Sequence, residues 1–289
     1  MFTTLISTDE LASRLGQPDL VICDVRHDLG NAAAWGQQQY LAGHIPGAVF
    51  VHLDRDLSAP NTGRTGRHPL PTPEAAAALF GRLGIATGRQ AVIYDQGSGA
   101  FAARLWWMLR WLGFETGAVL DGGFAKWTSE GRPVTTAVTT PDPAKFVIRQ
   151  VVPTVNASGV MASLPRHTLV LLDARAPERF RGESEPLDPV AGHIPGARNR
   201  PYTQNLDANG TFKHAAILRA EFEGVLDGAL PELVVHQCGS GVTACHNLLA
   251  MEIAGFPPTR LYPGSWSEWC SDPSRPVATG AEDQATRQR

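Results

Sequence analysis

The chain has 289 residues, a length that corresponds to two domains at about 150 residues per domain. Hydrophobic residues make up 43% and charged residues only 18%, which favours a sizeable core and excludes long disordered stretches. The net charge of −3 gives no basic field for nucleic acid or an anionic membrane surface. There is no apolar run of membrane-spanning length, no signal-peptide pattern, and no cysteine spacing typical of a disulfide framework or a zinc site. A soluble, cytoplasmic, two-domain protein is predicted.

Short apolar runs alternate along the chain with helical stretches. In chain order, the predicted strands cover residues 21–25, 91–94, 170–173 and 233–236, and predicted helices cover 100–112 and 242–254. Thr72, Pro73 and Glu74 predict the start of another helix, with a capping residue, a proline and an early acid. Continuous apolar runs between helices are typical of parallel sheets covered on both faces, so the sequence predicts an α/β fold.

The sequence contains a long internal repeat. Ala-Gly-His-Ile-Pro-Gly-Ala at 42–48 returns at 191–197, and Asp24-Val25-Arg26 is matched by Asp173-Ala174-Arg175. Further along, Gln-Gly-Ser-Gly at 96–99 is matched by Cys-Gly-Ser-Gly at 238–241, and 122–127 is matched by 264–269. Four matches in the same order indicate two copies of one domain. The predicted boundaries are 1–135 for the first, 136–152 for a linker, and 153–289 for the second.

A cysteine in the second copy lies where a predicted strand meets a predicted helix, in Val-Val-His-Gln-Cys-Gly-Ser-Gly-Val-Thr-Ala. Glycines allow a tight curl that turns backbone N–H groups inward, and the helix adds its positive end, so the loop forms an anion cradle. Cys238 is therefore the predicted nucleophile. The residues expected to hold the substrate or an anionic sulfur in this cradle are Gly239, Gly241, Val242 and Thr243.

The first copy has Gln96 at the place that the sequence match gives to Cys238, which predicts an inactive first domain. A buried structural role for Cys238 is the plain alternative. A cysteine phosphatase would need an arginine six residues after the cysteine, where this chain has Ala244. Ser240 does not lie in the Gly-x-Ser-x-Gly motif of serine hydrolases. The loop thus favours cysteine chemistry other than phosphate transfer.

Taken together, the paired Asp-x-Arg and Gly-His-Ile-Pro-Gly-Ala motifs, the Cys-Gly-Ser-Gly-Val-Thr-Ala loop and the closing Gly-Ser-Trp-Ser-Glu-Trp resemble the tandem rhodanese-type sulfurtransferases. The resemblance covers about 5–279. It implies two rhodanese-like domains, each with a mostly parallel sheet flanked by helices, and a catalytic second domain that cycles through a Cys238 persulfide. It implies a small-molecule sulfur donor, and a thiol, cyanide or thioredoxin-like acceptor. No cofactor, metal, nucleic acid or membrane partner is implied.

The loop also bears on the sulfur donor. In this family, thiosulfate-using members carry two cations after the cysteine, whereas Gly239 and Ser240 resemble the loop of the 3-mercaptopyruvate sulfurtransferases. Arg179 matches the arginine that binds the donor carboxylate, for which a guanidinium is well shaped. A second arginine usually precedes the second Gly-His motif, where this chain has Leu187. The sequence then leaves two expectations open: a weaker clamp on the carboxylate, or substitution by Arg200 or by an arginine of the first domain.

His44 resembles the first-domain histidine that the family places near Ser240 in a proton relay. Loss of sulfur from mercaptopyruvate leaves an enolate that must gain a proton, and an imidazole can supply it near neutral pH. His193 repeats the motif of His44, so both histidines could instead fasten a loop. Three functions stay open: transfer from 3-mercaptopyruvate, transfer from thiosulfate, and a persulfide-carrying or partner-binding module.

Overall fold

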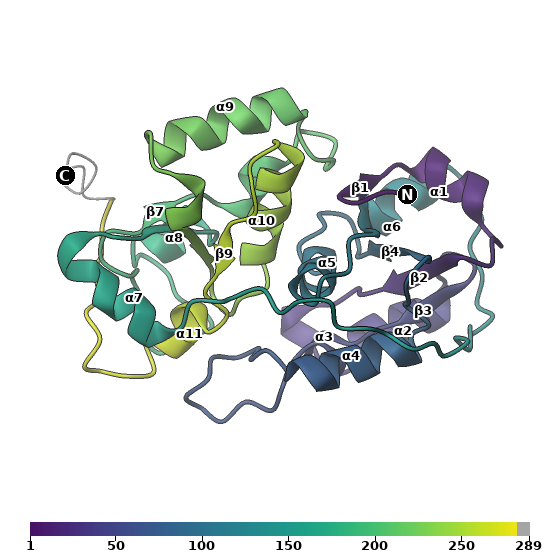
Figure 1. Ribbon diagram of the computed structural model, residues 1–289, viewed down its shortest axis with the longest axis horizontal. Helices are drawn as coiled ribbons and strands as arrows, with labels where there is room; N and C mark the ends of the chain where they lie inside the picture. The colour runs from purple at the N-terminus through teal and green to yellow at the C-terminus, as the bar shows by residue number, and fades with distance from the viewer. Residues whose placement is uncertain (282–289) are drawn as a thin grey trace. The chain divides into compact units, whose positions relative to one another are not determined.

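The structure, a computed structural model, describes residues 1–281 and divides them into two compact units (Figure 1). Unit 1 comprises residues 1–59, 70–152 and 207–212, and unit 2 comprises 60–69, 153–206 and the described residues from 213 onward. The main division falls at the end of the predicted linker, and the linker residues cluster with unit 1. The predicted domains are continuous segments, whereas 60–69 belongs to unit 2 and 207–212 to unit 1.

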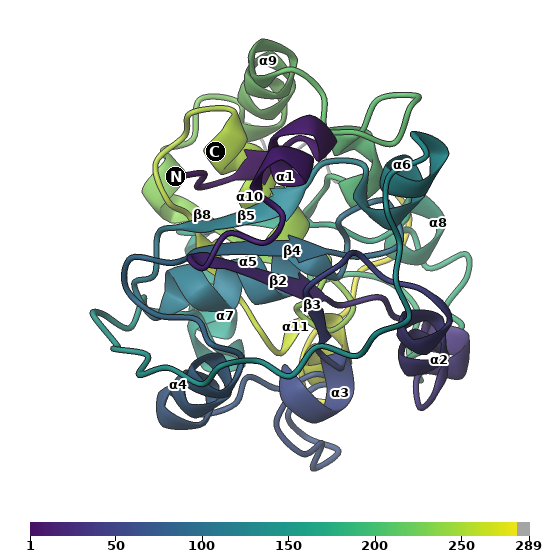
Figure 2. The ribbon, with the colours of Figure 1, turned by 90° about the vertical axis from the view of Figure 1, so that its right-hand side faces the viewer.

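Unit 1 is built on a parallel sheet with strand order β1-β5-β4-β2-β3 (Figure 2). The strands are β1 (Leu5–Ile6), β2 (Leu20–Asp24), β3 (Ala48–Phe50), β4 (Gln90–Tyr94) and β5 (Gly117–Leu120). The α-helices are α1 (Thr8–Arg14), α2 (Trp35–Ala42), α3 (Leu53–Asp56), α4 (Pro73–Arg82), α5 (Ala102–Trp111) and α6 (Gly123–Ser129), with a short 3-10 helix η1 (Leu29–Asn31). Side chains of α1, α2 and α6 share one core with the central strands, and α5 packs on β4 and β5.

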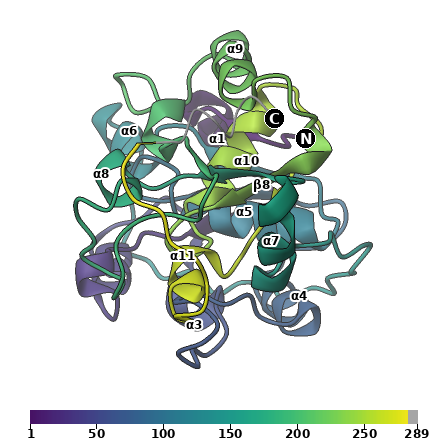
Figure 3. The ribbon, with the colours of Figure 1, turned by 90° about the vertical axis from the view of Figure 1, so that its left-hand side faces the viewer.

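Unit 2 repeats this plan with strand order β7-β6-β8-β9, again all parallel. Of these strands, β8 is labelled in Figure 3. The strands are β6 (Val170–Asp173), β7 (Arg198–Asn199), β8 (Val234–Gln237) and β9 (Arg260–Leu261). The α-helices are α7 (Ala157–Ser163), α8 (Pro177–Phe180), α9 (Ala215–Leu226), α10 (Ala244–Ile253) and α11 (Ser265–Trp269), and the 3-10 helices are η2 (Leu164–Arg166), η3 (Tyr202–Asn205) and η4 (Pro231–Leu233). Side chains of α7, α8 and α11 share a core on one face, while α9 packs on α10 (Figure 1).

The predicted α/β fold is confirmed, and the local signals that predicted it have a physical basis in the structure. The four apolar runs form β2, β4, β6 and β8, which lie side by side as pairs at the centre of each sheet. Helix α4 begins as predicted: the Thr72 side chain accepts a hydrogen bond from the Ala75 N–H, and Pro73 takes the first helical position. No helix formed by the described residues is both long and apolar enough to cross a membrane.

The repeated Asp-x-Arg motifs build the same buried ion pair in both units. Nη2 of Arg26 lies 2.7 Å from Oδ2 of Asp24, and the same atoms of Arg175 and Asp173 are also 2.7 Å apart. Each guanidinium also donates to the carbonyl of the glycine that opens the Gly-His motif, Gly43 in unit 1 and Gly192 in unit 2, at 2.8 Å. The pair therefore ties the end of a strand to the Gly-His loop, a structural role in both copies.

Candidate active site

Cys238 lies in the loop between β8 and α10, at the carboxyl end of the parallel sheet of unit 2. The residue is buried, at 1% exposure, and its Sγ accepts a hydrogen bond from the Gly241 N–H at 3.2 Å. The Cys238 N–H donates to Oγ of Ser265, and its carbonyl accepts from the Trp266 N–H. The loop is thus held against the start of α11, with its sulfur facing a backbone N–H group, as an anion cradle requires.

Gly241 gives the loop its curl. Its φ is 76°, in the left-handed region that favours glycine, and a Cβ on it would lie 2.3 Å from the carbonyl oxygen of Pro263. Val242 and Thr243 follow as the turn that opens α10, where their carbonyls accept from the N–H groups of Cys245 and His246. The roles of these residues in binding an anion remain predictions.

The loop of unit 1 provides an internal comparison and corrects the assignment of Gln96. Tyr94 and Gln237 occupy equivalent strand positions, because their carbonyls accept from Val25 and Ala174, which lie at matching places of the repeat. The Phe124 N–H donates to the carbonyl of Asp95, just as the N–H of Trp266, which matches Phe124 in the repeat, donates to the carbonyl of Cys238. Asp95, rather than Gln96, therefore stands at the place of the cysteine, and the unit 1 loop is one residue longer before its last glycine.

The carboxylate of Asp95 fills the cradle of unit 1. One oxygen accepts from the N–H groups of Gly97 (2.9 Å) and Gly99 (3.0 Å), and the other accepts from those of Phe101 (2.9 Å) and Ala102 (3.3 Å). A loop of this kind thus binds an anion in the copy that lacks a cysteine. In unit 2 the side chain at the same place is the thiol of Cys238.

The histidine beside Ser240 is His68, where the sequence predicted His44. Nδ1 of His68 lies 2.7 Å from Oγ of Ser240, and both residues are buried. In unit 1, the two ring nitrogens of His44 meet the carbonyls of Tyr40 and Ala137, and the residue is 0% exposed. His193 repeats this arrangement, with Nδ1 on a backbone carbonyl and the ring stacked on Phe180. Both motif histidines therefore hold the Gly-His loops in place through hydrogen bonds to backbone carbonyls.

Two arginines lie at the same loop residue. A Cβ on Gly239 would lie 2.8 Å from Nη2 of Arg67 and 3.5 Å from Nη1 and Nη2 of Arg179. Arg179 is the arginine that the sequence predicted, and Arg67 lies within 1–135, the predicted first domain from which a substitute arginine was one of the expectations. Their charges are balanced by two acids with side chains only 3% exposed: Arg179 bonds Glu185 at 2.6 Å, and both arginines pair with Asp188.

The segment before the second Gly-His motif, where the family usually has a second arginine, contains an acid that binds Arg67. Leu187 is 41% exposed, and its neighbour Asp188 instead receives the guanidinium of Arg67. Arg200, the other candidate, is engaged with Glu221 at 2.7 Å and with Asn205, in a buried polar network. Arg67 and His68 lie outside every repeated motif, so comparison of the two copies could not identify them as site residues.

Two other cysteines are poor nucleophiles. Burial, together with the charge of Asp24, raises the pKa of Cys23 to about 12, and burial, together with Asp188, raises that of Cys270 to about 11. At pH 8 the thiolate is thus a minor form of both cysteines. Brief iodoacetamide treatment at pH 8 is therefore expected to modify Cys238 before either of them, as read by peptide mass spectrometry. Labelling of Cys23 or Cys270 at the rate of Cys238 would contradict this.

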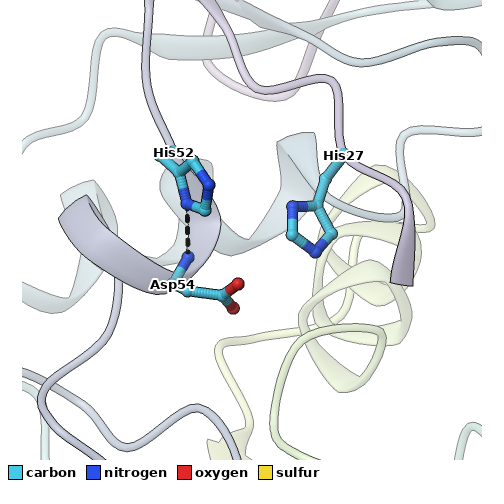
Figure 4. A group of neighbouring side chains, drawn as sticks. All are labelled: His27, His52 and Asp54. Carbon is cyan, nitrogen blue, oxygen red and sulfur yellow. Dashed lines mark hydrogen bonds between the residues drawn. The ribbon is translucent and has the colours of Figure 1, made fainter. Parts of the chain in front are cut away.

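One side-chain group in unit 1 has the composition of a metal site. His27, His52 and Asp54 can bring one ligand atom each within 4.8 Å of one another (Figure 4). However, Nδ1 of His52 accepts from the N–H groups of Asp54 (3.1 Å) and Arg55 (3.3 Å), which caps α3. With Nδ1 accepting, a neutral His52 carries its proton on Nε2. A nitrogen that binds a metal must have a free lone pair, so neither ring nitrogen of His52 is available as a ligand. We therefore assign the group to the packing of α3.

Comparisons with known proteins agree with the repeat. The family model for the rhodanese-like domain matches residues 7–130 and 158–272. The chain is 48% identical over 279 residues to the probable 3-mercaptopyruvate sulfurtransferase of Pseudomonas aeruginosa, covering 96% of this chain and 98% of that one. It is 36% identical to the thiosulfate sulfurtransferase of Bos taurus, covering 93% and 92%.

A solved structure supports the same conclusion. The crystal structure of SseA from Escherichia coli, a 3-mercaptopyruvate sulfotransferase, matches with a TM-score of 0.79 and 33% identity, over 92% of this chain and 99% of that one. The family match covers both copies of the domain, and Cys238 lies in the cradle of the second. The chain therefore belongs to the rhodanese-like family and is a tandem-domain sulfurtransferase.

Proposed function

We propose that the chain moves a sulfane sulfur from 3-mercaptopyruvate to a thiol or cyanide through a persulfide on Cys238, and that unit 1 takes no part in the chemistry. The observation that carries the proposal is the arginine pair beside Gly239, which two buried carboxylates neutralise. The relatives with the same activity in their names add to its support. The acceptor thiol includes that of a thioredoxin-like protein.

The first half-reaction is nucleophilic attack by Cys238. Its thiolate attacks the sulfur of the donor, an S–S bond forms, and the C–S bond of the donor breaks with its electron pair left on carbon. The product is a pyruvate enolate and a cysteine persulfide. The N–H of Gly241, which already donates to Sγ, is placed to stabilise the negative sulfur. An acceptor thiolate or cyanide then attacks the outer sulfur and restores the Cys238 thiolate.

The enolate needs a proton on carbon. We assign this step to the His68–Ser240 pair, because its 2.7 Å contact joins an imidazole to a hydroxyl that lies two residues from the nucleophile. This assignment replaces the predicted role of His44. Ser240 keeps the role that the sequence gave it, as the hydroxyl of the proton relay.

The charges beside Gly239 favour a monoanionic donor. Arg67 and Arg179 carry two positive charges, and their partners Glu185 and Asp188 carry two negative charges, so the four side chains together are neutral. A planar carboxylate can be held by guanidinium N–H groups without requiring net positive charge, since each charge-assisted hydrogen bond contributes ~1.5–3 kcal/mol. A dianion such as thiosulfate gains less from a neutral surrounding and loses more hydration.

Steady-state kinetics with both donors test this proposal. The kcat/KM for 3-mercaptopyruvate is expected to exceed that for thiosulfate by roughly 10–100-fold, the effect of about one missing charge-assisted bond. Arg67→Ala and Arg179→Ala should each raise KM for 3-mercaptopyruvate by roughly the same factor, with a smaller change in kcat. Arg181→Ala is the control, because Arg181 is exposed and pairs with exposed Glu183.

The second candidate is thiosulfate as the donor. The specific observation in its favour is that two guanidiniums meet at Gly239, which partly makes up for the absence of cations in the loop. A higher kcat/KM for thiosulfate in the unmodified enzyme would establish this candidate instead. If Arg67→Ala and Arg179→Ala turn over both donors as fast as the unmodified enzyme does, neither arginine binds the donor.

A further inference from the structure

Residues 60–69, which we call the strap, are connected at both ends to unit 1 yet pack with unit 2. The strap brings Arg67 to Asp188 and His68 to Ser240. Its earlier part reaches the segment after α11, where Arg64, Asp272 and Arg275 line one hollow of about 280 Å³. Two residues that we place in the site therefore depend on how this segment lies on unit 2.

One contact sets the distance between the strap and unit 2. Gly66 has φ 81°, and a Cβ on it would lie 2.7 Å from the carbonyl oxygen and 3.3 Å from the Cα of Gly264. Both atoms belong to the backbone, which cannot turn aside as a side chain can. Next to it, the Arg67 N–H donates to Oγ of Ser267 at 3.1 Å. Backbone contact and hydrogen bond together fix the strap at the start of α11.

The same turn holds the nucleophile. The N–H of Trp266 donates to the carbonyl of Cys238, and that of Ser267 donates to the carbonyl of Gly239. Gly264 and Ser267 therefore contact the strap, while the N–H groups of Trp266 and Ser267 hold the Cys238 loop. The strap and the loop are positioned against one common element, α11.

We propose that Gly66 and Ser267 are positioning residues, which dock the strap on α11 and so place Arg67 and His68 beside the Cys238 loop. The inference rests on the proposed function for the roles of Arg67 and His68. The docking itself does not depend on that function. Only glycine at position 66 permits the approach, because any side chain there meets the backbone of Gly264.

The strap contains its own control. Gly63 also has a positive φ, 77°, but a Cβ on it would have nothing within 4 Å. Gly63→Ala and Gly66→Ala thus carry the same backbone strain, and only the second pushes the strap away from α11. Gly66→Ala is expected to lower kcat/KM for 3-mercaptopyruvate at least about tenfold more than Gly63→Ala, with a higher KM and a lower kcat. In an Arg67→Ala background, Gly66→Ala should raise KM little further.

A protease measurement tests docking without any sulfur donor. Trypsin should cleave after Arg64 and Arg67 faster in Gly66→Ala than in Gly63→Ala, each normalised to a synthetic strap peptide with the same substitution. Ser267→Ala, which removes the hydrogen bond without backbone strain, should change both readouts in the same direction by less. Thermal unfolding should shift by similar amounts in Gly63→Ala and Gly66→Ala, which carry the same backbone strain, and should stay nearly unchanged in Ser267→Ala.

Equal tryptic rates and equal kinetics for Gly66→Ala and Gly63→Ala would overturn the inference, whatever the wild-type enzyme does. Faster cleavage in an enzyme that uses neither donor would instead support the docking contact and overturn the proposed function. Faster cleavage with unchanged kinetics would show that Arg67 and His68 do not need the docked strap, and would also overturn the inference.

Discussion

Cys238→Ser is expected to lower sulfur transfer from either donor by at least about 10³-fold, the scale of losing a catalytic nucleophile. A hydroxyl cannot hold sulfane sulfur, while the serine side chain is close enough in size to keep the loop and its bonds to Ser265 and Trp266. The measurement is steady-state turnover with 3-mercaptopyruvate and with thiosulfate, accompanied by thermal unfolding to confirm an intact fold.

Cys270→Ser is the matched control. It also changes a buried cysteine to serine, but Cys270 ends α11 and its thiol stays protonated near neutral pH. Its turnover should remain within a few-fold of wild type. Residual activity of Cys238→Ser above about 1% of wild type would show that another group carries the sulfur.

Gly241→Ala is expected to have the second-largest effect. Its Cβ would lie 2.3 Å from the carbonyl oxygen of Pro263, at a φ of 76° that an alanine rarely adopts. The loop must move, and the N–H that donates to Sγ of Cys238 moves with it. We expect a loss of kcat of about 100-fold and a lower free energy of unfolding by about 1–3 kcal/mol.

Gly239→Ala separates this effect from a general sensitivity of the loop. The three atoms nearest to a Cβ there belong to the ends of two flexible side chains, Nη2 of Arg67 at 2.8 Å and Nη1 and Nη2 of Arg179 at 3.5 Å. It should alter mainly KM for the donor and leave the free energy of unfolding nearly unchanged. If both variants lose kcat equally, the curl at Gly241 is not what aligns the cradle.

The features that local sequence could predict are those set by local chemistry. The central strands and the start of α4 at Thr72 follow from apolar runs and capping. The position of Cys238 between a strand and a helix follows from the same patterns. Repetition strengthened the predictions for the central strands, because the second copy served as a check on the first.

The features that local sequence missed depend on contacts between distant segments. His68 meets Ser240 across 172 residues of sequence, and Arg67 meets Asp188 across 121. No periodicity or motif encodes such a contact. The shared Gly-Ser-Gly also favoured Gln96 as the residue equivalent to Cys238. A sequence alignment does not contain the strand register, which makes Asp95 the equivalent residue.

The most direct test of the persulfide mechanism is incubation of the protein with 3-mercaptopyruvate alone, followed by intact mass and peptide mass spectrometry. We expect the mass of one added sulfur atom per chain, located on the Cys238 peptide and removed by cyanide or excess thiol. The cradle around Cys238 and the raised pKa values of Cys23 and Cys270 both predict that location. No added sulfur, or sulfur on any cysteine other than Cys238, would contradict the mechanism.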